Sequence, residues 1–386
     1  MKRTRKILVI AGERSGDRLA ARALKSALII ADSQNSALEL YGIGGPDCQK
    51  LGMECLYSTD QMSVVGFLEV AKRYPFFKGV FRKIVSLLDA KETKPDIVFL
   101  VDYPGFNLRI AKEAHKRGIR VVYYVSPQVW AWKASRIKDI VANVDDLLVI
   151  FPFEVEIYRS AGLAKTEFVG HPLLEMIDEE RSSYLSRADF AAKFGLNPEK
   201  DWLLIFPGSR NAEVSRHLRV MSEAAKIYCS GAEMQAIIVE SPSVAGECYR
   251  LFNDETIKHF NSGTDIHQLM SHSQLGILKS GTTTLEAALM ELPGVICYKT
   301  SYVSYAIAKF LITLKFIGLA NIVLGKKLYP ELIQSELTSA NIVNALATVR
   351  ANESEFRNEL KAIRGILRSP NESPSKRAAE ILLSDD

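Results

Sequence analysis

The chain has 386 residues, of which 47% are hydrophobic and 24% are charged, as is usual for a soluble globular enzyme. At about 150 residues per domain, this length predicts two or three domains. A net charge of +4 does not indicate a nucleic-acid partner, yet it would not repel a phosphorylated substrate or an anionic lipid surface.

The cysteines and histidines bear on the redox compartment and on metal binding. The five cysteines are scattered and form no Cys-x-x-Cys pair, which favours a reducing compartment with free thiols. The six histidines show no metal-ligand spacing, so we expect no metal site. The basic N-terminus runs into an apolar stretch at residues 7–11, which is too short for the core of a signal peptide. We therefore expect a strand there, and a cytoplasmic protein.

Short apolar runs alternate with helical patterns through the first part of the chain. A helical pattern at residues 15–30 follows the first strand. Further strands are predicted at residues 38–43, 97–101, 121–125 and 147–150. This alternation predicts a parallel sheet with helices on both faces.

Glycine, proline and polar residues follow four of these strands. They occupy residues 12–17, 42–46, 102–107 and 126–132. Ligands of parallel sheets bind beyond the carboxyl ends of the strands, so these segments are expected to line a cleft. None of them fits Gly-x-Gly-x-x-Gly, and Gly-x-x-x-x-Gly-Lys-Ser/Thr is absent, which disfavours a dinucleotide site or a P-loop.

Residues 62–83 interleave large apolar side chains with basic ones, which is the composition of a membrane-touching surface. The expected membrane contacts are Phe67, Leu68, Phe76, Phe77, Phe81, Lys72, Arg73 and Lys78. Residues 300–325 are also apolar, but Lys309 and Lys315 interrupt them, so they do not predict a transmembrane span. For both stretches, a packed core or a homodimer interface is the alternative.

A second run of strands and helices follows Gly170-His171-Pro172, the expected hinge. Its strands are predicted at residues 203–206, 235–239, 275–278 and 295–298. The chain closes with helical patterns at residues 340–350, 353–367 and 376–383, long enough to pack back across the first domain. We therefore expect domains at residues 1–171 and 172–340, with residues 341–386 returning to the first.

The strand at residues 203–206 ends in Pro207-Gly208-Ser209-Arg210, and a helical pattern starts at Asn211. Free N–H groups and the positive end of the helix dipole collect at such a point. Ser209 adds a hydroxyl donor, and Arg210 adds a planar guanidinium suited to phosphate or carboxylate. The sequence therefore favours an anion site, although an ordinary turn with a surface arginine is the alternative.

Ser280-Gly281-Thr282 repeats this arrangement after the strand at residues 275–278. A helix with Leu285 inward follows, so a second helix start suited to anions is expected. Glu286 lies about one turn into that helix, where a carboxylate can accept hydrogen bonds from a ribose diol. A surface glutamate that complements the helix dipole is the alternative.

Eight motifs stand in order along the chain and cover it nearly end to end. They occupy residues 11–17, 42–46, 62–70, 124–132, 151–154, 170–172, 207–210 and 280–286. Together they resemble the motifs of the lipid-A-disaccharide synthases. The resemblance implies an α/β fold of the GT-B type, with two Rossmann-like domains facing across a cleft and the last helices crossing back to the first domain.

The resemblance implies an inverting glycosyltransferase without a cofactor, peripheral on the cytoplasmic surface of the inner membrane. It would transfer 2,3-diacylglucosamine from UDP-2,3-diacylglucosamine to the 6-hydroxyl of 2,3-diacylglucosamine 1-phosphate, giving lipid A disaccharide 1-phosphate and UDP. Two alternatives stay open. A UDP-sugar 2-epimerase of the same architecture would need no acyl-chain surface, and a non-catalytic, membrane-associated nucleotide sensor would not need Asp102.

Roles follow for particular residues. Asp102 matches the first aspartate of the family's Asp-x-Pro-Asp-Phe-Asn motif and is the expected general base, with a turn-capping aspartate as the alternative. Gly105 replaces the second aspartate of that motif. Arg210 and the helix that starts near Gly281 would neutralise the departing diphosphate without a metal.

The resemblance also extends to residues further from the chemistry. Those expected on the donor side, besides the ones already described, are Asn321, Glu331 and Gln334. Those expected on the acceptor side are Ser15, Gly16, Ser63, Asn107 and Gln128.

Overall fold

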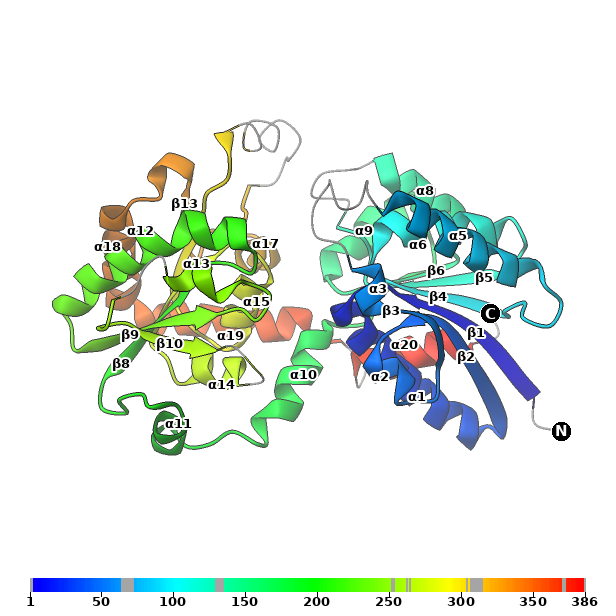
Figure 1. Cartoon of the computed structure of the whole chain (residues 1–386), viewed down its shortest axis with the longest axis horizontal. Coiled ribbons are helices and arrows are strands. Elements are labelled where there is room, and N and C mark those ends of the chain that lie inside the picture. The colour runs from blue at the N-terminus through cyan, green and yellow to red at the C-terminus, as the bar shows by residue number, and fades with distance from the viewer. Residues whose placement is uncertain are drawn as a thin grey trace. The chain divides into compact units, whose positions relative to one another are not determined.

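The computed structural model describes residues 3–63, 73–128, 135–250, 254–261, 263, 265–302, 305, 315–369 and 373–384. The chain forms two compact units, Met1–Glu175 with Leu367–Asp386, and Met176–Ile366. Each unit is built around one parallel sheet (Figure 1). The two expected runs of alternating strands and helices therefore fold as two separate α/β units.

The sheet of the first unit has, among the described residues, seven parallel strands in the order β3-β2-β1-β4-β5-β6-β7. Helices α1, α2 and α20 lie on one face, and α5, α6 and α8 lie on the other (Figure 1). The strands are β1 (Arg3–Ala11), β2 (Ser36–Gly44), β3 (Glu54–Ser58), β4 (Ile97–Val101), β5 (Arg120–Tyr124), β6 (Asp146–Val149) and β7 (Thr166–Phe168). The helices are α1 (Arg14–Ser33), α2 (Pro46–Gln49), α3 (Thr59–Met62), α5 (Tyr74–Asp89), α6 (Pro104–His115), α8 (Ser135–Asn143), α9 (Pro152–Ser160) and α20 (Pro374–Leu383).

The second unit has a sheet of six described strands in the order β10-β9-β8-β11-β12-β13. These are β8 (Asp201–Phe206), β9 (Met234–Glu240), β10 (Lys258–Asn261), β11 (Leu275–Lys279), β12 (Gly294–Tyr298) and β13 (Glu331–Ile333). The helices are α11 (Arg187–Phe194), α12 (Asn211–Ser230), α13 (Gly246–Arg250), α14 (Ile266–Ser271), α15 (Thr282–Leu289), α17 (Leu319–Leu324), α18 (Ser339–Ala351) and α19 (Glu353–Leu367). Helix α10 (Pro172–Arg181) contains the passage from the first unit to the second.

The apolar runs form these strands because the sheets are covered on both faces. Residues 7–10 of β1 and all of β4 are buried, and Ile7 lies opposite Ile97 in the β1–β4 register. In the second unit, Leu203 of β8 lies opposite Leu275 of β11, and both are fully buried. Strands buried on both sides have no polar alternation, which is why they appear as continuous hydrophobic runs.

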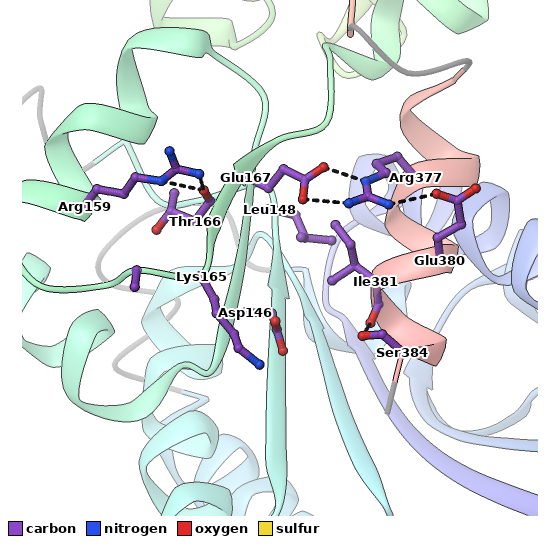
Figure 2. Close-up of a pocket in the computed structure, with 11 residues that line it drawn as sticks. Asp146, Leu148, Arg159, Lys165, Thr166, Glu167, Arg377, Glu380, Ile381 and Ser384 are labelled. Carbon is purple, nitrogen blue, oxygen red and sulfur yellow. Dashed lines mark hydrogen bonds and ion pairs between the residues drawn. The ribbon is translucent and has the colours of Figure 1, made fainter. Parts of the chain in front are cut away.

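The chain returns to the first unit after Ile366. Helices α18 and nearly all of α19 therefore belong to the second unit, so the returning segment is shorter than the expected 341–386. Helix α20 packs on α1. Arg377 of α20 binds Glu167 of β7 through two bonds of 2.5 and 2.9 Å (Figure 2). Beside this ion pair lies a pocket of about 360 Å³ that includes Asp146 and Lys165.

Candidate functional site

Both sheets reverse their strand order at one point, and several of the predicted residues follow the strands beside it. In the first unit the order reverses between β1 and β4, and in the second between β8 and β11. Open parallel sheets bind ligands at such switch points, beyond the carboxyl ends of the strands. Asp102 directly follows β4, while Gly208 to Arg210 follow β8 and Ser280 follows β11. Each unit therefore carries one candidate site.

Asp102 lies in a strained turn of the first unit. Asp102 and Tyr103 have φ angles of 47° and 51°. These angles lie in the left-handed region, which residues other than glycine rarely adopt. Such a conformation costs about 1–3 kcal/mol per residue and persists only where the surroundings enforce it. The carbonyl oxygen of Asp102 accepts hydrogen bonds from Tyr123 Oη at 2.6 Å and Asn107 Nδ2 at 2.7 Å. These two donors hold the turn.

The Asp102 carboxyl is half-buried, and burial raises its pKa. The nearby charge of Glu13 raises the pKa further, while a hydrogen bond from the Tyr103 backbone opposes the shift. A carboxylate with a raised pKa is a stronger base than an exposed one. The electrostatics of this turn therefore suit a group that removes a proton from a hydroxyl.

Gly12 permits the turn because the Tyr103 ring lies directly against it. A Cβ atom at Gly12 would lie 2.5 Å from Cδ1 of that ring. The Tyr103 hydroxyl donates to the carbonyl oxygen of Met62 at 3.0 Å. The ring therefore ties together the ends of β1 and β4 and the end of α3.

The expected acceptor-side residues fall into two groups. Ser15, Ser63 and Gln128 are exposed near the carboxyl ends of the strands, where a ligand could reach them. Gly16 and Asn107 are buried. The Asn107 amide also donates to the carbonyl oxygens of Ile10 and Val101, each at 3.3 Å. Asn107 is therefore a residue that positions Asp102.

Two buried acids of the first unit were not singled out from the sequence. Asp17 accepts hydrogen bonds from the backbone N–H of Gly45 at 2.7 Å and of Asp47 at 3.0 Å, which fixes the glycine-rich loop after β2. Glu154 accepts from the Ser126 hydroxyl at 2.7 Å, which fixes the segment after β5. Asp17 lies in the motif at residues 11–17, and Glu154 lies in the motif at residues 151–154. Their places in these motifs could have identified them from the sequence.

In the second unit the loop after β8 wraps around Glu213 of α12. Gly208 has a φ of 139°, and a Cβ atom there would lie 2.6 Å from Cβ of Glu213. The Glu213 carboxylate accepts a hydrogen bond from Ser209 N at 3.1 Å and contacts Lys279 Nζ at 2.8 Å. Arg210 is the N-cap residue of α12 and is exposed. The predicted anion loop therefore already contains a carboxylate.

The loop after β11 has the expected helix start, with Gly281 as the N-cap of α15. The Ser280 hydroxyl donates to the carbonyl oxygen of Ile317 at 2.8 Å, and Thr282 is exposed. Glu286 is half-buried, and burial raises its pKa, while His267 opposes this shift and Glu180 adds to it. Unlike Ser280, the Thr282 and Glu286 side chains have no hydrogen-bond partner among the residues that the structure describes.

Asn321, Glu331 and Gln334 are buried, and their polar atoms bind other parts of the unit. Glu331 accepts from Gly318 N at 3.0 Å and from Asn321 Nδ2 at 2.9 Å. Gln334 Oε1 accepts from Thr300 N at 2.7 Å. These three residues fix the segment before α17 and the segment after β12.

His217 is a buried residue that the sequence analysis did not identify. Its Nε2 accepts from Lys299 N at 2.8 Å, so Nδ1 carries the proton and donates to the Pro207 carbonyl oxygen at 3.1 Å. The ring therefore joins the ends of β8 and β12. The sequence could have indicated that His217 faces the loop after β8. It lies four residues after Glu213, about one helical turn, and therefore on the same face of α12.

Burial lowers the pKa of His217 to about 4 from 6.5. Between these values the unfolded chain binds more protons than the native one, so stability rises with pH and is lost as pH falls. The loss approaches about 3 kcal/mol near pH 4. We expect His217→Gln, which keeps a donor and an acceptor but does not titrate, to flatten the pH dependence of urea unfolding between pH 7 and 4.5. If the free energy of unfolding changes with pH equally in the variant and the wild type, other groups cause the loss of stability in acid.

The expected membrane contacts lie partly within the described residues. Phe67, Leu68 and Lys72 fall outside them. Phe76, Phe77 and Phe81 of α5 are half-buried and pack against the core of the first unit. The Arg73 guanidinium lies 4.9 Å from the Phe76 ring centroid and donates to the Gln61 carbonyl oxygen at 2.6 Å. Lys78, which was also expected to contact the membrane, is exposed on α5 together with Arg82 and Lys83.

Within the part of the chain that the structure describes, no group of three or more His, Cys, Asp or Glu residues could hold a metal ion. No helix there has both the length and the apolar character needed to cross a bilayer.

Solved structures with the same architecture bind UDP-sugars or transfer sugars. The UDP-GlcNAc 2-epimerase of Neisseria meningitidis, bound to UDP-GlcNAc, aligns with a TM-score of 0.56 at 12% identity, covering 99% of this chain and 98% of that one. The calicheamicin glycosyltransferase CalG4 aligns with a TM-score of 0.59 at 13% identity, covering 99% and 97%. At this identity the likeness establishes the fold, which is that of two Rossmann-like domains.

Sequence comparison is more specific. The family model described as lipid-A-disaccharide synthetase matches residues 7–384. The lipid-A-disaccharide synthase of Trichlorobacter lovleyi is 35% identical over 374 residues, covering 94% of this chain and 93% of the relative. That of Coxiella burnetii is 36% identical over 349 residues, covering 90% and 89%. Since both comparisons span nearly the whole chain, it belongs to the lipid-A-disaccharide synthase family.

Proposed function

We propose that this chain transfers 2,3-diacylglucosamine from UDP-2,3-diacylglucosamine to the 6-hydroxyl of 2,3-diacylglucosamine 1-phosphate. The products are lipid A disaccharide 1-phosphate and UDP. Family membership supports this reaction over the UDP-sugar 2-epimerase and the nucleotide sensor. The observation that carries it is the position of Asp102, a carboxylate of raised pKa in a strained turn at the switch point of the first sheet.

In this proposal Asp102 acts as the general base. It removes the proton of the acceptor 6-hydroxyl while that oxygen attacks the anomeric carbon of the donor. The bond from the anomeric carbon to the diphosphate breaks, and UDP leaves from the opposite face, which inverts the configuration. Ser15, Ser63 and Gln128 are exposed on the same unit and are the proposed acceptor contacts.

The second unit would bind the donor. The exposed Arg210 and the N-terminal turn of α15, with Thr282, would contact the diphosphate, because cationic and N–H donors stabilise its developing charge. Glu286 would accept hydrogen bonds from the ribose. Asn321, Glu331 and Gln334 would act indirectly, by fixing the segments beside this site.

A product assay separates the three candidate functions. The protein is first incubated with UDP-2,3-diacylglucosamine alone and then with the acylated acceptor added. We expect disaccharide phosphate and UDP only in the second mixture. A changed sugar configuration in the donor alone would identify an epimerase, and UDP-sugar binding without any product would identify a sensor.

We also propose peripheral binding to anionic membranes. Both substrates carry two acyl chains, and moving a chain into water costs about 0.8 kcal/mol per CH₂. The exposed side of α5 presents Lys78, Arg82 and Lys83, which would face lipid phosphates. Phe76 and Phe77 pack on the core, so we place the contact on the exposed basic side of this helix and on its exposed Tyr74.

Charge reversal tests this surface without disturbing the core. Lys78→Glu with Arg82→Glu is expected to weaken binding to phosphatidylglycerol vesicles by roughly 30-fold or more, since each basic residue near a membrane contributes about 1 kcal/mol and each new carboxylate is repelled by the lipid. Binding should also fall as salt rises. The matched control is Lys25→Glu with Lys165→Glu, the same charge change at exposed positions elsewhere on the first unit. Equal losses in both variants would point to net charge and away from α5.

A further inference from the structure

We propose that Lys279 is a second cation for the donor diphosphate, and that Glu213 is the counter-ion that Lys279 leaves when the diphosphate binds. This inference rests on the proposed function, because it takes the second unit as the donor site. Neither residue was expected to have a role from the sequence. Both lie at the switch point of the second sheet, where β8 and β11 are neighbours.

The two residues connect the two loops that suit an anion. Glu213 lies in the first turn of α12, behind the loop after β8, and Lys279 is the last residue of β11. Their side chains are both only 17% exposed, and Lys279 Nζ lies 2.8 Å from Glu213 Oε1. Lys279 Nζ also lies 3.6 Å from where a Cβ atom of Gly281 would be. The ammonium group therefore lies beside the start of α15 while it is paired with the start of α12.

The Glu213 carboxylate has the partners that a phosphate oxygen would seek. Its Oε2 accepts a hydrogen bond from Ser209 N at 3.1 Å, and its Oε1 contacts the Lys279 ammonium. A backbone N–H before a helix and a lysine ammonium are the donors that phosphate sites combine. Gly208 is needed because this carboxylate occupies the space beside it, with Oε2 2.9 Å from where a Cβ atom would lie. The loop thus already holds one internal anion.

The charges explain why a diphosphate would displace this anion. Burial raises the pKa of Glu213, but contact with Lys279 and Ser209 and the nearby charge of Arg210 lower it more, so the net pKa lies below the ordinary value and the group is ionised at neutral pH. A diphosphate carries more negative charge than a carboxylate, so it competes for Lys279 and is repelled by Glu213. The lysine stem is flexible enough to exchange partners. Glu213 would therefore weaken UDP binding and help the product to leave.

Two single substitutions should change UDP affinity in opposite directions. Glu213→Gln keeps an acceptor for Ser209 N but removes the charge, so we expect UDP to bind about tenfold more tightly, as for the loss of one nearby like charge. Lys279→Met removes the cation, so we expect UDP to bind roughly 10- to 100-fold more weakly. Isothermal titration calorimetry on the full chain measures both. In steady state, Glu213→Gln should lower kcat and KM together, because product release becomes slower.

Controls separate this role from a structural one. Uridine has no phosphate, so neither substitution should change its affinity. Lys326→Met removes the lysine of an ion pair with Glu359 in the same unit, and it should leave UDP affinity at the wild-type value. Equal or weaker UDP binding by Glu213→Gln, with an unchanged unfolding midpoint, would show that Glu213 only caps α12 and would overturn the proposal.

The failure of this inference differs from the failure of the proposed function. If the wild-type protein binds no UDP and makes no disaccharide, the donor assignment itself is wrong. If the wild-type protein binds UDP and Lys279→Met binds it equally well, the donor assignment stands, but Lys279 is not a diphosphate ligand.

Discussion

Replacement of Asp102 by asparagine is expected to lower turnover by about 10²- to 10⁴-fold, the usual contribution of a general base. UDP affinity should stay near that of the wild type. Asparagine has almost the same shape but cannot take up the proton. The bonds that hold the turn go to the carbonyl oxygen of Asp102 and not to its side chain, so they remain in the variant. Initial rates of disaccharide formation measure the effect.

A matched control separates catalysis from loop geometry. Tyr123→Phe removes the hydroxyl that donates to the Asp102 carbonyl oxygen, and it should cost far less than the loss of the carboxylate. The pH profile gives a second readout, because burial raises the pKa of Asp102. As the pH is lowered, the rate should begin to fall at a higher pH than it would with an aspartate of ordinary pKa. Turnover of Asp102→Asn within a few-fold of wild type would remove Asp102 from this role.

Arg210→Ala is expected to weaken UDP binding and sugar transfer together. A charge-assisted hydrogen bond contributes roughly 1.5–3 kcal/mol, which corresponds to a loss of about 10- to 100-fold. Arg210 is exposed at the N-cap of α12, so its loss should not affect folding. Arg216→Ala, an exposed arginine further along the same helix, is the matched control and should bind UDP normally. Unchanged UDP affinity in Arg210→Ala would count against this diphosphate contact.

The central strands of both sheets were predictable from the sequence, and the four edge strands were not. The unpredicted strands β3, β7, β10 and β13 occupy the outermost positions of the two sheets. Each contains a charged residue, such as Glu54 in β3 and Lys258 in β10. An edge strand has a neighbour on one side only, so polar residues interrupt its apolar run, which is then too weak to be distinguished from a loop.

The strand-loop-helix geometry of the candidate site was predictable where it lies within one short segment. The Gly208–Arg210 and Ser280–Glu286 segments each follow a buried strand and precede a helix, so local sequence was sufficient. The contact between Glu213 and Lys279 depends on β8 and β11 being neighbours. Strand order is a long-range property that a single sequence does not reveal. The buried role of Asn107 depends in the same way on packing between distant segments, because its amide donates to the carbonyl oxygen of Ile10.

The return of α20 to the first unit has a consequence for how the protein is made. Helix α20 covers α1, and Arg377 binds the edge strand β7. On the ribosome, about 190 residues of the second unit must be added before α20 emerges, which takes roughly 10–40 s at usual rates of synthesis. During that time the surface of α1 that α20 covers is exposed to other nascent chains. The second unit can meanwhile fold before the first has its last helix, although the first begins emerging earlier.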